Sequence, residues 1–155
     1  MESPEAFTRA YCATPLGLLE IRGRGSRISH IRFVTSGRRR RSGHPALKKF
    51  TGEIRRYFKG TQKTFSASFA PEGTPFQKKV WKALSGIAFG RTASYRDIAR
   101  RIGNPRAVRA VGGAAGRNPL LIAVPCHRVI ARDGKLSGFA CGVRRKAWLL
   151  RHEQR

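Results

Sequence analysis

Acidic side chains are scarce in this sequence. Its 155 residues include 8 Asp and Glu against 33 Lys and Arg, which gives a net charge of +25 at pH 7. A chain so short of negative charge attracts polyanions, and its pI near 11.8 points the same way. Nucleic acid is the favoured partner, although an anionic membrane surface would attract the same charge.

Long apolar runs and a secretion signal are also missing. No stretch approaches the roughly 18 apolar residues that span a bilayer, and the first residues contain no apolar core of a signal peptide. We therefore expect a soluble, cytoplasmic protein that binds no membrane.

Cysteine is rare, with three residues at widely separated positions, Cys12, Cys126 and Cys141. The odd number argues against a disulfide framework and favours a reducing compartment. A zinc deaminase would need a second cysteine in its Pro-Cys-x-x-Cys segment, and none follows Cys126 at that spacing. A site made from Cys126, Cys141, His127 and His152 has no recognisable spacing, so we expect neither a metal nor a cofactor.

The chain is long enough for one hydrophobic core or two small ones, because a protein of this size buries about two-thirds of its unfolded surface. It has no internal repeat, and its one biased segment is Arg38-Arg39-Arg40-Arg41. We interpret this run as a solvated surface loop; the alternative is an extra loop that contacts phosphates.

The first half of the chain has the pattern of a small α+β domain, residues 1–70. Two strands, a helix and a third, short strand are predicted over residues 16–21, 28–34, 44–58 and 65–69. Apolar residues recur at helical spacing within the helix, at Leu47, Phe50, Ile54 and Phe58. Pro71-Glu72-Gly73 then forms a linker.

The second half, residues 71–155, is predicted to be mainly helical. Thr74-Pro75 starts a helix that ends at Phe89-Gly90. Ser94 and Asp97 have the spacing of a capping box, and the helix that they start stops at Gly103.

A third helix is expected over residues 106–115, capped by Asn104-Pro105. Val108 and Val111 should face inward, and Arg106 and Arg109 should face outward. Two short helices joined by a Gly-containing turn are typical of a helix-turn-helix. The second is rich in Gly and Ala and poor in base-reading side chains, which argues against sequence-specific readout.

The strongest chemical signal is the apolar run that ends in Pro125-Cys126-His127-Arg128-Val129. A thiol beside an imidazole and a guanidinium is biased toward the reactive thiolate. The alternative interpretation is a buried, inert cysteine. The residues on either side decide between the two.

Four motifs, in this order along the chain, resemble those of the O6-alkylguanine-DNA alkyltransferase family. They are Ser94-Tyr95 at a helix start, Gly112-Gly113-Ala114-Ala115-Gly116-Arg117-Asn118-Pro119, Pro125-Cys126-His127-Arg128-Val129, and Arg144-Arg145-Lys146-Ala147-Trp148-Leu149-Leu150-Arg151-His152-Glu153. The resemblance implies an α+β protein. A small N-terminal α/β, ribonuclease H-like domain precedes a mainly helical winged-helix or helix-turn-helix domain that carries the DNA-binding surface and the alkyl acceptor.

The resemblance also implies roles for five residues. Cys126 would accept the alkyl group, His127 would take its proton through a water molecule, and Glu153 would orient the imidazole. Tyr95 would give a proton to the leaving guanine and crowd the DNA phosphate as the nucleotide rotates. Asn118 would be the hinge that ties the helix-turn-helix to the active-site strand.

Further positions follow from the same resemblance. The DNA contacts would be Tyr95, Arg96, Asn104, Arg109 as the finger that fills the gap in the duplex, Ala110, Gly112, Arg117 and Arg132. The wall of the substrate pocket would be Pro125, Val129, Phe139, Ala140 and Cys141. Phe139 stands where the family usually has tyrosine, Cys141 where glycine or tryptophan is common, and Ala88 where proline is frequent.

The implied function is direct-reversal DNA repair. A thiolate displaces the alkyl group from O6-alkylguanine, and from O4-alkylthymine, leaving a thioether on a protein that is used once. The implied partner is double-stranded DNA bearing the lesion, bound by a cytoplasmic, nucleoid-associated monomer without a cofactor. Two other classes stay open: a non-enzymatic sensor of alkyl lesions, and a helix-turn-helix regulator.

Overall fold

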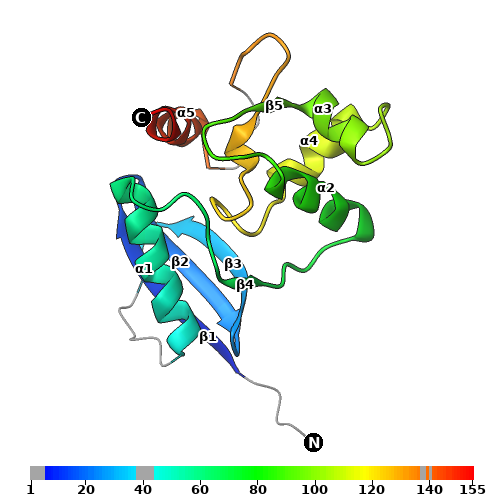
Figure 1. The fold of residues 1–155 in the computed structure, drawn as a ribbon. Helices are drawn as coiled ribbons and strands as arrows, with labels where there is room; N and C mark the ends of the chain where they lie inside the picture. Colours follow the sequence, from blue (N-terminus) through cyan, green and yellow to red (C-terminus); the bar gives the residue numbers. More distant parts are fainter. Residues whose placement is uncertain (1–5, 38–43, 137–138, 140) are drawn as a thin grey trace, which may run out of the picture. The chain divides into compact units, whose positions relative to one another are not determined.

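The computed structural model describes residues 6–37, 44–136, 139 and 141–155. The chain divides into two compact units, Met1–Glu72 and Gly73–Arg155 (Figure 1). The first unit contains a sheet and one helix, and the second contains four helices and a two-stranded ribbon in its described part. This confirms the predicted α+β class, with the sheet domain first and the helical domain second.

The sheet of the first unit has the order β1-β2-β3-β4. Strands β1 (Phe7–Thr14), β2 (Gly17–Arg24) and β3 (Arg27–Val34) are antiparallel, and β4 (Ser68–Phe69) pairs in parallel with β3. The sequence analysis missed β1, because its inward positions are the small Ala10 and Cys12 and its apolar alternation is weak.

Helix α1 (Pro45–Lys59) packs on this sheet (Figure 1). His44 caps its start by accepting a hydrogen bond from the amide of Ala46. Leu47, Phe50 and Ile54 are buried as predicted, but Tyr57 is buried in place of the expected Phe58. The spacing of 47, 50, 54 and 57 follows the turn of the helix more closely than a step of four to residue 58.

The second unit is formed by α2 (Pro75–Ser85), α3 (Tyr95–Arg101), α4 (Val108–Gly116) and α5 (Val143–Glu153). Between α4 and α5 lie a short 3-10 helix, η1 (Cys126–Arg128), and β6 (Val129–Ile130). Strand β6 pairs in parallel with β5 (Ala93–Ser94), which leads directly into α3. This pairing joins the segment after Cys126 to the start of the helix-turn-helix.

Two of the three predicted helix starts in this unit are confirmed. Thr74 and Ser94 each form a complete capping box, with Gln77 and Asp97 respectively. The third prediction is wrong, because Asn104-Pro105 lies in a turn and α4 begins at Val108 without a side-chain cap. Val108 is accordingly 36% exposed rather than inward-facing, whereas Val111 is buried.

The predicted end of the first helix also differs. Helix α2 ends at Ser85, with Gly86 as its C-cap, and does not continue to Phe89-Gly90. Gly90 instead has a positive φ of 76°, a turn conformation that suits glycine. Trp81 anchors α2 against α4 by donating its indole N–H to the carbonyl oxygen of Ala114, at 2.8 Å.

The apolar run before Cys126 forms a tight turn and no strand. Leu121 and Val124 form an isolated bridge across it, and Ile122 between them has a φ of 72°. This left-handed conformation is unfavourable for a β-branched residue, and it is held because Ile122 is 1% exposed. The turn fixes the direction in which Pro125 and Cys126 leave it.

No helix in the described part of the chain is long and apolar enough to cross a membrane. Within the same residues, no group of three or more His, Cys, Asp or Glu side chains is placed to hold a metal ion.

Candidate active site

Cys126 is the first residue of η1 and is 5% exposed. Burial raises the pKa of its thiol to about 11, against the lowering effects of Asn118 and Lys146. The sequence analysis expected His127 and Arg128 to favour the thiolate. The structure differs, because both neighbours turn to Glu153 and the thiol at rest stays protonated at neutral pH.

His127 is fully buried, and its Nε2 lies 2.7 Å from Oε1 of Glu153. Burial lowers the pKa of the imidazole, while the hydrogen bond to Glu153 raises it. A carboxylate accepts only from a protonated nitrogen, so the neutral ring carries its hydrogen on Nε2 and a lone pair on Nδ1. Nδ1 is buried and has no hydrogen-bond partner in the described structure, so it is a base available for a proton.

Arg128 completes this network from the third position of η1. Its Nε and Nη2 donate to the two oxygens of Glu153 at 2.8 and 3.0 Å, and its Nη1 donates to the carbonyl of Ile87 at 2.6 Å. Glu153 is 4% exposed, although the sequence without the resemblance presents it as a surface acid near a terminus. One carboxylate therefore satisfies both side chains that follow Cys126.

Asn118 binds the acceptor loop directly. Its Nδ2 donates to Cys126 Sγ at 3.1 Å and to the carbonyl of Val124 at 2.8 Å, and its Oδ1 accepts from the amide of Leu120 at 2.9 Å. A hydrogen bond donated to sulfur favours the thiolate, and this contact lowers the pKa of Cys126. The amide thus links the end of the helix-turn-helix to the thiol.

Tyr95, the first residue of α3, is half-buried beside the acceptor. A side chain at Gly112 would lie 3.9 Å from the Tyr95 ring, so the ring lies against α4 at ordinary contact distance. Burial and the negative charge of an ionised Cys126 both raise the pKa of the phenol. The hydroxyl therefore keeps its proton until a stronger base needs it.

The sequence analysis missed Lys146. Its side chain is 1% exposed, and Nζ lies 6.0 Å from the centre of the Tyr95 ring. The available signal was its position three residues before Leu149 and seven before Glu153, which places a lysine on the buried face of α5. Lysine is rarely found fully buried, so such a position calls for a physical reason.

The expected wall of the substrate pocket is partly described. Pro125, Val129 and Phe139 are buried and Cys141 is half-buried, whereas Ala140 lies outside the described residues. A charge on Cys141 would raise the pKa of Cys126, so the two thiols are close enough to interact.

The residues expected to contact DNA are mostly exposed. These are Arg96, Asn104, Arg109, Ala110, Arg117 and Arg132. Gly112 is half-buried against the ring of Tyr95. Alanine and glycine leave the exposed side of α4 slim, with Arg109 projecting from its first turn.

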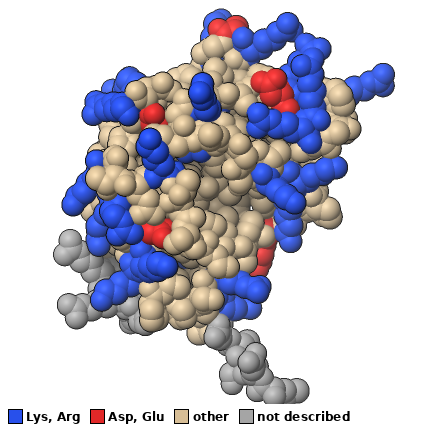
Figure 2. Space-filling model, in the orientation of Figure 1, with Lys and Arg blue, Asp and Glu red and all other residues tan. Residues whose placement is uncertain are grey.

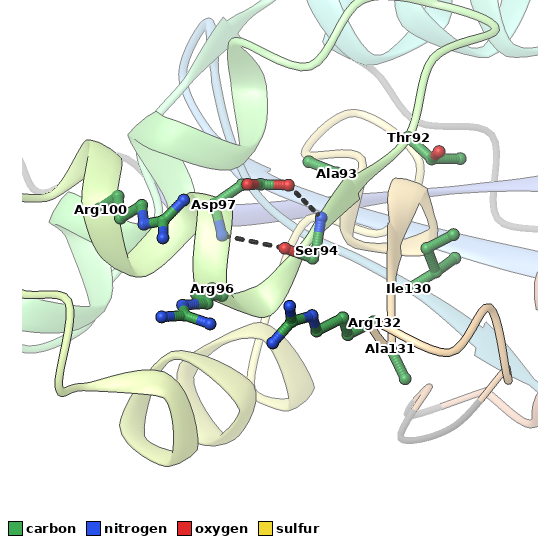
Figure 3. Close-up of a pocket in the computed structure, with 9 residues that line it drawn as sticks. All are labelled: Thr92, Ala93, Ser94, Arg96, Asp97, Arg100, Ile130, Ala131 and Arg132. Atoms are coloured by element: carbon green, nitrogen blue, oxygen red, sulfur yellow. Dashed lines mark hydrogen bonds between the residues drawn. The ribbon is translucent and has the colours of Figure 1, made fainter.

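A hollow of about 380 Å³ lies beside α3, between that helix and the paired strands β5 and β6 (Figure 3). Arg96, Arg100 and Arg132 line it, together with Asp97. Asp97 is already engaged, because its carboxylate accepts from the Ser94 amide at 2.8 Å within the capping box. The sequence analysis did not select Arg100, which lies one helical turn after Arg96. Three guanidinium groups around a hollow with one engaged acid form a site for an anion.

Positive charge also dominates the wider surface. On the face drawn in Figure 2, lysine and arginine side chains are spread widely and acidic side chains are few. The basic composition is therefore not confined to one segment of the sequence.

Comparisons with known proteins agree with this geometry. Residues 75–155 match the model of the 6-O-methylguanine DNA methyltransferase DNA-binding domain, and residues 8–71 match that of its ribonuclease-like domain. A methylated-DNA–protein-cysteine methyltransferase of Methanosarcina barkeri is 45% identical over 149 residues, which cover 91% of this chain and 93% of the relative. A protein of the same name from Haemophilus influenzae is 40% identical, with 96% of this chain and 87% of the relative covered.

A solved structure gives the same result. Mycobacterium tuberculosis OGT in complex with DNA has a TM-score of 0.86 and 40% sequence identity to this chain, covering 94% of this chain and 92% of the other. The two domain matches span both units, and the relatives align over nearly their whole length. The chain belongs to the 6-O-methylguanine DNA methyltransferase family.

Proposed function

We propose that this protein repairs DNA by moving the alkyl group of O6-alkylguanine, and of O4-alkylthymine, onto Sγ of Cys126. The observation that carries the proposal is a buried thiol at the start of η1, next to a His127–Glu153 pair whose free imidazole nitrogen is buried without a partner in the described structure. A DNA-bound relative with 40% identity supports DNA as the partner.

The reaction begins with ionisation of the thiol. The Cys126 proton passes through a water molecule to Nδ1 of His127, and Glu153 stabilises the imidazolium that forms. Sγ then attacks the alkyl carbon, so the S–C bond forms as the bond from that carbon to O6 breaks. Tyr95 gives its proton to the leaving guanine, and the imidazolium proton returns to the phenolate through solvent. Atoms and charge balance, and the product on the protein is a neutral thioether.

The thioether ends the reaction for that molecule. A C–S bond in a thioether is not hydrolysed under mild conditions, and no described residue is placed to reverse it. One protein molecule therefore removes one alkyl group, and repair is stoichiometric.

Access to the buried thiol requires that the nucleotide leave the duplex. Flipping a base out costs a few kcal/mol of stacking, and a side chain that fills the gap offsets part of that. Arg109 projects from the slim exposed face of α4 and takes this role, with α4 in the minor groove. The hollow between Arg96, Arg100 and Arg132 receives a backbone phosphate. Asn104 and Arg117 add contacts on the same helices and turn.

An intact-mass experiment tests the acceptor. After incubation with a duplex containing O6-methylguanine, the protein should gain one methyl group, and peptide mapping should place it on Cys126. The Cys126→Ala variant should bind the duplex and repair nothing. Repair of several lesions by one molecule, or methyl found only at Cys12 or Cys141, would overturn the proposal.

A second experiment tests the finger. Arg109→Ala should slow repair in duplex DNA and leave the reaction with free O6-benzylguanine unchanged, because the free base needs no flipping. Arg106→Ala, at another exposed arginine nearby, is the matched control and should change neither reaction. An equal loss on duplex and free base would show that Arg109 acts on the thiol site instead.

The two other classes make different predictions. A lesion sensor would bind the alkylated duplex without gaining mass, and a regulator would prefer one sequence over others. Cys126 and the small side chains of α4 argue against them respectively. Because its substrate is in genomic DNA, we infer that the protein acts in the cytoplasm with the nucleoid, as a monomer.

A further inference from the structure

Helix α5 turns two opposite charges toward the residues of η1. Its buried side chains are Lys146, Leu149 and Glu153, spaced at three and seven residues along one face. Glu153 meets His127 and Arg128, the second and third residues of η1. Lys146 lies about two turns earlier on the same face, and its charge interacts with Cys126, the first residue of η1.

The groups around Lys146 come from four segments. They are Cys126, His127 and Arg128 of η1, Tyr95 of α3, Cys141 before α5, and Glu153 of α5 itself. The acid among them, Glu153, accepts hydrogen bonds from His127 and Arg128. When Cys126 ionises, its thiolate is a further negative charge in this cluster.

We propose that Lys146 is a positioning residue whose ammonium group stabilises the negative charge of Cys126 while the sulfur attacks. The proposal rests on the proposed function only in taking Cys126 as the acceptor. Lys146 transfers no proton and forms no bond. It makes ionisation of the buried thiol less unfavourable, and it lies beside the ring of Tyr95, whose hydroxyl gives up a proton in the same step.

The titration behaviour of the pair agrees with this role. Burial lowers the pKa of Lys146, and an ionised Cys126 raises it again. Burial raises the pKa of Cys126, and Lys146 lowers it. Each charge alone is unfavourable in this buried place, whereas the two together compensate each other. His127 takes the proton, and Lys146 favours the anion that remains.

Alkylation removes one member of the pair. The thioether carries no charge, so after the reaction Lys146 remains in the same buried place without the thiolate. A buried charge that has no counter-charge is unfavourable for the folded state. We therefore expect the alkylated protein to be less stable than the free protein, and Lys146 to cause part of the difference.

The first test measures the pH dependence of Cys126 alkylation by iodoacetamide, with the modified peptide identified by mass. In Lys146→Met the midpoint should rise by about one pH unit, so the rate at neutral pH should fall about tenfold. Near pH 11, where the thiol itself ionises, the rates should converge. Lys146→Arg keeps the charge and should keep the wild-type midpoint.

Controls separate charge from structure. Lys82→Met removes an exposed lysine of α2 in the same unit and should leave the profile unchanged. Lys146→Gln, a second neutral side chain, should shift the midpoint in the same direction as Lys146→Met. A wild-type midpoint in either neutral variant, or an equal loss of rate at every pH, would overturn the proposal.

The second test compares melting temperatures before and after alkylation of Cys126 by iodoacetamide. The wild-type Tm should fall on alkylation, and that of Lys146→Met should fall less. An equal fall in both would overturn the proposal. Iodoacetamide needs neither DNA nor an alkylated base, so these results judge Lys146 even if O6-alkylguanine fails as a substrate, an outcome that would overturn only the proposed function.

Discussion

At the scale of single residues, the site depends on how one carboxylate is shared. Glu153 lies within hydrogen-bond distance of His127 and Arg128, and all three side chains are nearly inaccessible to solvent. Opposite charges in such a place are stable together, while either alone is strongly unfavourable. The arrangement fixes the imidazole tautomer, and it also draws Arg128 away from the thiol.

Replacing this carboxylate tests the network. Glu153→Gln leaves Arg128 buried without a counter-charge, and the free energy of unfolding should fall by about 3–5 kcal/mol. Alkyl transfer should slow as well, because the amide no longer stabilises the imidazolium. Urea unfolding measures the first effect, and single-turnover methyl transfer measures the second.

Asp133→Asn supplies the matched control. Asp133 is exposed and lies 3.9 Å from the exposed Lys135, and a surface pair of this kind contributes about 0–1 kcal/mol. A loss from Glu153→Gln no larger than that from Asp133→Asn would contradict the buried network. Removing the charge of Arg128 together with that of Glu153 should recover part of the stability.

At the scale of elements, α3 holds three parts of the site together. Its first residue is Tyr95, its N-cap Ser94 belongs to β5, and its first turn supplies Arg96 and Asp97 to the hollow (Figure 3). The capping box determines where the helix begins, and hence where the phenol lies relative to Cys126. Local hydrogen bonds at a helix start therefore act on the chemistry.

The cap gives a prediction that depends on pH. Hydrogen bonds from the backbone and side chain of Ser94 lower the pKa of Asp97 from its ordinary 3.8. Because the folded-state pKa is the lower one, ionised Asp97 stabilises the fold above the unfolded-state pKa. This contribution disappears as the pH falls through the folded-state pKa. Asp97→Asn should therefore destabilise the protein at neutral pH, and the difference should vanish in acid, as followed by thermal melts.

Ser94→Ala tests the other half of the cap and should lower the free energy of unfolding by about 0.5–2 kcal/mol. Thr74→Ala, at the equivalent cap of α2, should have a similar effect on stability and none on phosphate binding. If the Asp97→Asn difference persisted below pH 3, about a unit under the ordinary pKa, the assigned cause would be wrong.

At the scale of the whole molecule, charge and site have to be distinguished. A net charge of +25 attracts DNA over the whole surface, whereas the hollow beside α3 offers three guanidinium groups at one place. Each phosphate neutralised contributes about −0.9 to the slope of log affinity against log salt. The slope therefore reports how many phosphates are neutralised, and not how many charges the protein carries.

The expected outcome separates these sources. Replacing Arg96, Arg100 and Arg132 by alanine should reduce the steepness of the slope by about 0.9 for each phosphate that the protein no longer neutralises. Replacing three exposed lysines of α1, Lys48, Lys49 and Lys59, by alanine should leave the slope unchanged. Fluorescence anisotropy with a short duplex at several salt concentrations measures both.

The run of four arginines at 38–41 lies outside the described residues and is tested in the same assay. Its replacement by serine should leave the slope unchanged, as expected of a solvated loop. A slope that fell with the run, or with the α1 lysines, would locate the interface elsewhere.

The sequence by itself determined the features that depend on nearby residues or on composition. The capping boxes at Thr74 and Ser94 span three residues, and the positive charge needs no fold at all. The family motifs also selected Cys126, His127 and Glu153 together. Local patterns failed where a cap was absent, as at α4, and where a strand had small inward residues, as at β1.

Only the tertiary structure decided how the charges pair. His127 and Glu153 are 26 residues apart, and Arg128 reaches the carbonyl of Ile87 over 41 residues. The sequence put His127 and Arg128 next to Cys126, yet packing turned both toward Glu153 and brought Lys146 to the buried face that meets the thiol's own helix. Adjacent residues on a chain point in different directions, so the protonation of a buried group is set by the elements that pack against it.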